Sequence, residues 1–437
     1  MPTFSQLISI SPNNEAIPYL ATRTGYLYVN LNYGGNPNAI GYIRRYNLSN
    51  LTYTDLYSGN GHAMWQGVYL KHKNLFVRAG EFKDSGGTFR AGIAVHDLSS
   101  DTISTYYRSD TGDANEFIGT VYDYKNRRII VGERRQGGLT SGSSYPNGGG
   151  LWVIPEDSLS NPSAWSRVYQ FSAIVSGGLV PEVRALAILG DYIFAEIWDG
   201  TNVRIVRASL SNLTSWSIID DPGIDSGVYS YRDMVYYMKK GTNGNLLVVY
   251  SKDGSTWSTI DTGIALSSLT DASLPVTVST AHGKYIFIVV QKSTGASVVL
   301  VNFDTGTASV VGNIANQVGP HQAGVALDDT VFLGGAFGTG GYIYQYKFDS
   351  KRVLTLTTPS SASPGSQITL TAKLTDGTNP ISGATIEFWV VNSLVDGKFS
   401  GTLIGTATTD ANGNASMTYT IPSTTTGFMI FRAEYRG

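Results

Sequence analysis

The 437-residue sequence predicts an all-β protein in two parts, and three observations lead to this prediction. A short phrase, in which a turn residue precedes a run of aliphatic and aromatic residues, recurs seven times before residue 351, at intervals of about 40 to 65 residues. A second phrase, a strand that ends in Leu-Ser, keeps step with the first. No segment shows a helical period, and after residue 351 apolar residues alternate with polar ones.

The two phrases define one repeated unit. The first phrase occupies residues 25–29, 73–77, 126–131, 191–195, 244–249, 284–288 and 329–333. The second phrase ends at Leu48, Leu98, Leu159 and Leu210, with weaker equivalents at Phe303 and Phe348. Repetition at this period is typical of units that bury their apolar faces only against their neighbours. Units of about four strands arranged radially form a β-propeller, so residues 1–351 are predicted to be a seven-bladed propeller.

The units differ in how clearly they show four strands. The fourth unit is the clearest, with strands at 183–189, 192–195, 203–207 and 216–219. The third is swollen by a Gly- and Ser-rich loop at 137–150. The fifth runs from Tyr231 to Ile260 and is expected to lack one strand. Segment 7–10 precedes the first unit and is expected to supply the outer strand of the seventh, because such closure removes exposed sheet edges.

Residues 352–437 are predicted to form a β-sandwich of the immunoglobulin type. Six or seven short strands with strict alternation fit into this segment, as at 368–374, 386–390 and 415–421. Four stretches resemble the Ig-like repeats of bacterial and archaeal invasin-type adhesins, surface-layer proteins and phage tail proteins: 363–370, 381–388, 409–415 and 431–435. The resemblance implies display, stalk or adhesion rather than catalysis.

A single segment, residues 251–257, resembles the Asp-box turn of sialidase-like propellers. Its characteristic residues are Ser251, Asp253, Gly254 and Trp257. In such turns the Asp accepts hydrogen bonds from backbone amides and the Trp packs beneath. The segment is expected to follow the second strand of its unit, whereas the Asp-box of the family joins the third and fourth. It favours a propeller and implies nothing about chemistry.

Composition excludes several classes of function. The net charge is -2 and no long basic run is present, which argues against a nucleic-acid partner. Cysteine is absent, so disulfides, thiolate metal sites and Cys nucleophiles are excluded. No apolar stretch reaches the roughly 18 residues that a membrane span needs. The first residues lack the basic and apolar regions of a secretory signal.

Candidate site residues follow from the propeller geometry, because polar residues at the starts of the innermost strands gather around the channel mouth. They are Glu15, His62, Glu116, Glu182, Arg184, Arg232, Asp233 and His321. Carboxylates with two imidazoles could hold a divalent ion, or act as acid and base in glycan hydrolysis. The preferred interpretation is a hydrogen-bonded channel wall without cofactor or catalytic residue.

Surface chemistry offers two further signals. Acceptor triplets for N-linked glycans begin at Asn47, Asn50, Asn212 and Asn414 and indicate a glycoprotein, although chance and turn composition explain much of this pattern. The chain also contains 27 tyrosines and 7 tryptophans. Exposed members of this set would suit stacking on sugars or contacts with proteins.

The function that these features favour is a non-enzymatic virion structural or attachment protein, with an archaeal virus as the source. An adhesin-type domain without a secretory signal fits a particle that assembles inside the cell. The propeller would contact host glycan, host protein or neighbouring virion or surface-layer subunits at the virion or cell surface, and a homo-oligomer is compatible with this role. Two alternatives remain open: a carbohydrate-active propeller, either glycosidase or lectin, and a cellular surface-layer or filament subunit.

Overall fold

The computed structural model describes most of the chain. The residues outside the description are 1–2, 12–14, 24, 34–39, 61–62, 109–114, 136–148, 172–180, 199–201, 225, 267–275, 293–294, 315–322, 328, 338–339, 349–351, 396–397 and 436–437. Within the described part the chain is all-β, and its only helical turns are short 3-10 turns at Lys71–Lys73, Glu156–Ser158 and Pro162–Ala164. No helix of this part is long and apolar enough to cross a membrane.

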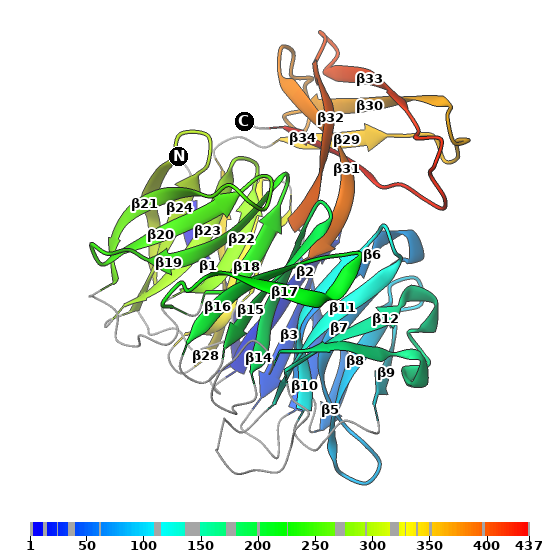
Figure 1. Cartoon of the computed structure of the whole chain (residues 1–437). Helices are drawn as coiled ribbons and strands as arrows, with labels where there is room; N and C mark the ends of the chain where they lie inside the picture. The colour runs from blue at the N-terminus through cyan, green and yellow to red at the C-terminus, as the bar shows by residue number, and fades with distance from the viewer. Residues whose placement is uncertain are drawn as a thin grey trace.

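Seven antiparallel four-stranded sheets account for the first part of the chain (Figure 1). Sheet 1 contains β2 (Glu15–Arg23), β3 (Tyr26–Tyr33), β4 (Ile40–Asn47) and β5 (Tyr53–Asn60); sheet 2 contains β6 (Ala63–Leu70), β7 (Leu75–Lys83), β8 (Phe89–Asp97) and β9 (Thr102–Tyr107). Sheet 3 contains β10 (Asn115–Asp123), β11 (Arg128–Arg135), β12 (Gly150–Pro155) and β13 (Ser166–Gln170); sheet 4 contains β14 (Glu182–Leu189), β15 (Tyr192–Trp198), β16 (Val203–Ser209) and β17 (Asn212–Asp220).

The remaining three sheets continue the pattern. Sheet 5 contains β18 (Val228–Tyr231), β19 (Met234–Lys240), β20 (Asn245–Ser251) and β21 (Ser258–Ala265); sheet 6 contains β22 (Val276–His282), β23 (Tyr285–Lys292), β24 (Gly295–Asn302) and β25 (Thr307–Ile314). Sheet 7 contains β26 (Ala323–Leu327), β27 (Thr330–Phe337), β28 (Gly340–Lys347) and, beside β28, the N-terminal strand β1 (Thr3–Ser11).

Neighbouring sheets contact one another mainly through their first strands. Strand β2 contacts β26 and β6, strand β10 contacts β6 and β14, and β14 contacts β18. Strand β22 contacts β26, and sheets 5 and 6 meet through β21 and β25. The arrangement is therefore propeller-like, with sheet 7 adjacent to sheet 1.

Burial follows the position of each strand within its sheet. Strand β14 is buried along almost its whole length, because sheets 3 and 5 cover both of its faces. Its sequence from Ala185 to Leu189 is accordingly a continuous apolar run, as expected for a strand buried on both faces. The outermost strand of the same sheet, β17, is mostly exposed and carries polar residues. In sheet 4 the innermost strand is therefore apolar and the outermost strand is polar.

Sheet 5 corrects the prediction of a missing strand. Strands β18 and β19 are joined by only two residues, Arg232 and Asp233, and form the first hairpin of a complete four-stranded sheet. The predicted unit begins at Tyr231, which is the last residue of β18, and so omits this strand; the short connection after it contains neither Gly nor Pro to mark a turn. The phrase at 244–249 consequently belongs to the third strand, β20, whereas the other six copies lie in second strands.

The C-terminal sheets are two three-stranded sheets. The first has the order β29 (Val353–Thr357), β30 (Gln367–Thr375), β33 (Asn414–Thr420); the second has the order β32 (Lys398–Thr408), β31 (Thr385–Val395), β34 (Phe431–Tyr435). The six strands agree with the predicted number. Alternate residues of β30 and β31, such as Leu370, Leu374 and Phe388, are buried in a core of their own.

The hairpin formed by β31 and β32 extends toward the seven sheets (Figure 1). Trp389, Val391 and Phe399 of this hairpin share a hydrophobic core with Tyr231 and Ile288 of sheets 5 and 6. Backbone hydrogen bonds add to the contact, because Tyr124 donates its N–H to the carbonyl of Asn392 at 3.4 Å. The hairpin meets β10 and β18 where these first strands end.

Candidate functional site

Two groups of Glu, Arg and Trp side chains lie where the first strands of sheets 3 and 4 begin. In the first group, Arg134 of β11 stands opposite Glu116 of β10, and its Nε lies 2.5 Å from Glu116 Oε1. The indole N–H of Trp65, from β6, donates to the other carboxylate oxygen of Glu116. The guanidinium of Arg134 lies 5.1 Å from the Trp65 ring centre. One buried carboxylate therefore positions both a cation and an aromatic ring.

The second group repeats this arrangement one sheet further on. The Arg184 Nε lies 3.0 Å from Glu182 Oε2, and the Arg184 guanidinium lies 4.2 Å from the centre of the Trp198 ring. Glu182 and Trp198 are cross-strand partners in β14 and β15. Because side chains on one face of an antiparallel pair are neighbours, the pairing of these strands brings the three groups together.

The two groups adjoin and form one site, which we call the Glu116–Glu182 site. Burial raises the pKa of Glu116; the ion pair with Arg134 and the indole N–H oppose this, and the charge of Glu182 adds to it. Burial of Arg134 is outweighed by the carboxylates of Glu116, Glu182 and Glu81, so its pKa is raised. Such mutual influence requires the groups to lie close together.

Exposure differs between the two kinds of charge in this site. The side chains of Arg134 and Arg184 are 16% and 21% exposed, whereas those of Glu116 and Glu182 are 0% and 8% exposed. The carboxylates thus lie behind the guanidiniums, and solvent meets the cationic groups first. Planar guanidiniums on aromatic rings are a common arrangement for recognising anionic or hydroxyl-rich ligands.

Glu196 lies behind the second group and is fully buried. One of its oxygens, Oε2, accepts hydrogen bonds from the backbone N–H groups of Ser226 at 3.2 Å and Gly227 at 2.7 Å. Its Oε1 has no hydrogen-bond partner among the described residues. Burial raises the pKa of Glu196 to about 7, although Arg184 and the two N–H groups favour the charged form. The group therefore titrates near neutral pH.

The structure brings together three of the residues that the sequence singled out, Glu116, Glu182 and Arg184. Glu15 is the first residue of β2, but its side chain is outside the description, as are His62 and His321. Trp65, Arg134, Trp198 and Glu196 were missed. Arg134 and Trp198 are the cross-strand partners of Glu116 and Glu182, and that position is the signal that could have found them. Trp65 lies inside β6 and Glu196 pairs with Ala185, so no such signal marks these two residues.

Arg232 and Asp233 lie elsewhere, which corrects their predicted place beside Glu116. They form the turn after β18, whereas Glu116 and Glu182 lie at the starts of their strands. Arg232 is 2% exposed, and its Nη2 lies 3.5 Å from Glu387 Oε2 and 3.4 Å from Glu434 Oε2 of the C-terminal sheets. Taking Tyr231 as the beginning of a strand rather than its end placed these two residues at the wrong end of the sheet.

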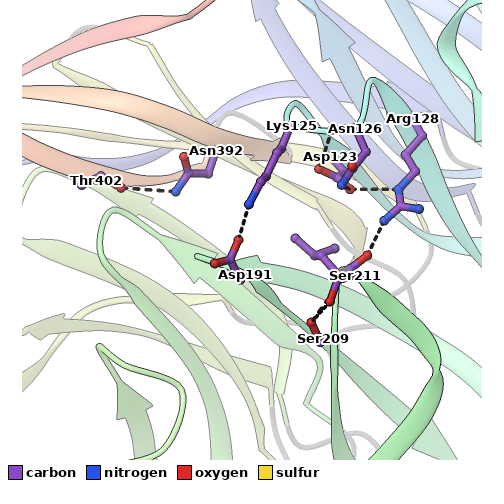
Figure 2. Close-up of polar contacts among 10 residues, drawn as sticks. Asp123, Lys125, Asn126, Arg128, Asp191, Ser209, Ser211, Asn392 and Thr402 are labelled. Carbon is purple, nitrogen blue, oxygen red and sulfur yellow. Dashed lines mark hydrogen bonds and ion pairs between the residues drawn. The ribbon is translucent and has the colours of Figure 1, made fainter. Parts of the chain in front are cut away.

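Polar contacts at this other end tie neighbouring sheets together beside the C-terminal hairpin (Figure 2). Lys125, which follows β10, reaches Asp191 of the β14–β15 turn at 2.8 Å. Arg128 binds Asp123 at 2.9 Å and the carbonyl of Leu210 at 2.7 Å. These contacts join sheet 3 to sheet 4 and are structural.

The remaining predicted residues have structural roles. Asp253 Oδ1 accepts hydrogen bonds from the N–H groups of Ser255 at 2.7 Å and Thr256 at 2.6 Å, and these bonds lower the pKa of Asp253. Trp257 packs edge-on against Phe194 and Tyr237. This Asp-box-like turn joins β20 to β21, the third and fourth strands, and so corrects the expected position.

The four candidate glycosylation asparagines also lie in or next to turns. Asn47, Asn50 and Asn212 each accept hydrogen bonds from the Ser or Thr two residues later. Asn414 begins β33 and is half-buried. As for metals, no three His, Asp or Glu side chains within the described ranges are grouped closely enough to hold an ion. The predicted ion site with His62 and His321 lies outside these ranges.

This chain was compared with family models, curated proteins and solved structures. No family model and no curated protein matches this chain. Similar solved structures include an oligogalacturonate lyase of Vibrio parahaemolyticus, at 10% identity and a TM-score of 0.49, covering 79% of this chain and 97% of that one. An ulvan lyase, a polysaccharide lyase, matches at 9% identity and a TM-score of 0.48, covering 78% and 96%.

A prolyl endopeptidase matches at 10% identity and a TM-score of 0.48, covering 83% of this chain but only 55% of that one, so this chain spans about half the length of the peptidase. The all-β, propeller-like arrangement itself follows from the sheets and their contacts. The prediction of a non-enzymatic virion attachment protein finds no counterpart in these three structures, which are described as two lyases and a peptidase.

Proposed function

We propose that this protein is a carbohydrate-active propeller that binds an acidic glycan at the Glu116–Glu182 site. In this proposal the seven four-stranded sheets are the blades of one propeller, formed by residues 1–351. Residues 352–437 are an Ig-like sandwich attached at the opposite end from the glycan. Among carbohydrate-active propellers, this one would bind acidic polysaccharides, and it would bind them at the Glu116–Glu182 site.

The exposure of the charged groups carries the proposal. Arg134 and Arg184 present partly exposed guanidiniums, and each is held by a carboxylate that lies deeper. A guanidinium whose Nε is engaged by such a carboxylate keeps a fixed orientation, and its exposed part faces a ligand. Two such groups on neighbouring sheets suit the repeated carboxylates or sulfates of an acidic polysaccharide.

The other side chains of the site have matching roles. Trp198 is half-buried beside Arg184 and offers an aromatic edge to a sugar ring. Glu182 is the carboxylate of the site with exposed surface, so it is the group placed to exchange a proton with a bound sugar. Glu116 is fully buried and positions Arg134 and Trp65.

A binding experiment with matched polysaccharides tests the proposal. Polygalacturonate, chondroitin sulfate and uncharged dextran are titrated into the protein, and the heat of binding is measured. We expect the two acidic polymers to bind and dextran to bind at least tenfold more weakly. Arg184→Lys keeps the charge but loses the planar fork, and we expect it to weaken binding about tenfold.

Arg45→Lys is the matched control, because Arg45 pairs with Asp101 and is 24% exposed but belongs to β4. It should leave binding unchanged. Release of unsaturated or reducing ends from the bound polymer, and its loss in Glu182→Gln, distinguishes a cleaving enzyme from a lectin. Equal binding of dextran and the acidic polymers, or no effect of Arg184→Lys on binding, would refute the proposal.

A further inference from the structure

A groove of about 660 Å³ lies between the seven sheets and the C-terminal sheets. Its walls come from the turn after β6, from the end of β10, from the edge strand β29 and from the segment that leads into β34. It lies at the ends of the first strands, whereas the Glu116–Glu182 site lies at their starts. The groove is therefore a separate feature, and its volume falls within the range of pockets for small molecules.

The charges of the groove have one sign. Its charged lining residues are Lys71 and Arg432, the imidazole of His72 also lines it, and none of the described residues that line it is Asp or Glu. Lys71 is exposed, and it takes part in none of the ion pairs found among the described residues. Arg432 is held by Glu434 at 2.6 Å, and His72 by the buried Glu156 at 3.0 Å. Carboxylates thus position Arg432 and His72, whereas Lys71 has no such partner among the described residues.

The remainder of the lining is largely apolar and aromatic. His72 stacks on Phe428 with ring centres 4.1 Å apart, and Tyr124 meets the same Phe428 ring edge-on at 6.3 Å. Leu354 and Leu356 of β29 also line the groove. A ligand that fills this space must bury a hydrophobic body against these side chains.

One buried polar atom in the wall lacks a partner. The hydroxyl of Tyr124 is enclosed and has no hydrogen-bond partner among the described residues. A buried donor without an acceptor is costly, so an acceptor supplied by a ligand would be favourable. A negatively charged oxygen meets this need and also complements Lys71.

From these observations we infer that the groove binds a small carboxylate with a hydrophobic, ring-containing body. The body lies between Phe428 and the leucines of β29, and the carboxylate lies toward Lys71 and the Tyr124 hydroxyl. The inference does not depend on the glycan proposal, because the two sites share no residue.

Three naphthalene compounds that differ only in charge test the inference by calorimetric titration of the full chain. They are 2-naphthoate, the neutral 2-naphthamide and 2-naphthylmethylammonium. We expect the naphthoate to bind at least tenfold more tightly than the ammonium compound. Lys71→Gln should weaken naphthoate binding about three- to fivefold, whereas Lys240→Gln, an exposed lysine of β19 outside the groove, should have no effect.

Tyr124→Phe separates a ligand role from a structural role. It removes the hydroxyl that lacks a partner, so the free protein should melt at the same or a higher temperature, while naphthoate binding should weaken. Equal binding of the anionic and cationic compounds, absence of binding at millimolar concentration, or unchanged affinity in both Lys71→Gln and Tyr124→Phe would overturn the inference.

Discussion

Gly401 of β32 donates its backbone N–H to the carbonyl of Arg232 at 2.8 Å, and the N–H of Arg232 donates back to the carbonyl of Phe399. Arg232 and Ser400 thereby form a parallel β-bridge between the turn after β18 and the C-terminal hairpin. Arg232 adopts a φ of 55°, a left-handed conformation that is uncommon for a residue with a Cβ. Main-chain hydrogen bonds and a buried cation therefore join the two parts of the chain.

Replacing Arg232 by Ala should destabilise the protein strongly. The change leaves Glu387 buried without its cation, and Glu434 with only Arg432. Removing one partner of a buried ion pair costs about 3 kcal/mol or more. The midpoint of urea unfolding, followed by tryptophan fluorescence, measures the loss.

The neighbouring pair of Lys252 and Asp233 provides the control. Lys252 is 58% exposed, so Lys252→Ala should cost less than about 1 kcal/mol. If both variants unfold at the same urea concentration, the buried cluster does not hold the two parts together.

Glu196 should make the protein less stable as the pH rises. Its pKa is about 7 in the folded chain, above the ordinary value of 4.5, because burial disfavours the charged form. The folded state therefore binds this proton more tightly than the unfolded state, and stability falls between about pH 4.5 and pH 7. Glu196→Gln retains the acceptor for Ser226 and Gly227 without the charge.

We expect Glu196→Gln to be more stable than the parent chain at pH 8, by an amount on the order of 1–3 kcal/mol, and close to it at pH 4.5. Urea unfolding at both pH values provides the measurement. A stability difference that does not change with pH would show that Glu196 does not titrate in this interval.

Glu156 should have the opposite pH dependence. Burial disfavours its charge, but hydrogen bonds from Arg127, Tyr122, His72 and Lys73 outweigh burial and lower its pKa to about 2. Because this folded-state pKa lies below the ordinary 4.5, the stability that the carboxylate contributes is present above pH 4.5. It is lost as the pH falls toward 2.

Glu156→Gln should therefore be less stable than the parent chain by about 2–3 kcal/mol at pH 6, with a smaller difference at pH 3. Thermal unfolding at the two pH values, followed by circular dichroism, measures this. Asp157→Asn is the control, since Asp157 is exposed and its pair with Lys73 is a surface contact. A gap between parent and Glu156→Gln that widens on acidification would contradict the assignment.

Gly132 should not tolerate a side chain. It lies in β11, and a Cβ there would overlap the side chain of Val183 in β14, so sheets 3 and 4 would have to separate. Overpacking of this kind costs about 1–3 kcal/mol. Gly119→Ala, whose Cβ would lie 3.2 Å from the backbone of Ala185, should cost less, and unfolding midpoints of the two variants compare them. A larger loss in Gly119→Ala would reverse this ranking.

The all-β character and the repeated unit could be predicted from the sequence, because both depend on local chemistry. Turn residues and Leu-Ser endings mark where strands stop, and the structure confirms strands that end next to Leu48, Leu98 and Leu210, whereas the strand predicted to end at Leu159 ends at Pro155 and is followed by a 3-10 turn. The strand count of sheet 5 could not be predicted in this way. The Arg232–Asp233 connection has no Gly or Pro, and the left-handed conformation of Arg232 is stabilised by hydrogen bonds to β32, which lies about 170 residues further along the chain.

The candidate site was only partly predictable for a related reason. Glu116, Glu182 and Arg184 stand out because charged residues are rare at the start of apolar strands. Arg134 and Trp198 belong to second strands, and nothing in their sequence neighbours indicates which residues they face. Antiparallel register decides this, and register depends on the whole hydrogen-bonded ladder.

The sequence by itself determined that this protein is built of short antiparallel strands, because alternation and turn chemistry act over a few residues. Only the tertiary structure decided which charges share a site, why Arg232 is buried beneath the C-terminal sheets, and where the groove beside Tyr124 opens. These features depend on contacts between residues far apart in the chain, and such contacts form only when whole sheets pack against one another.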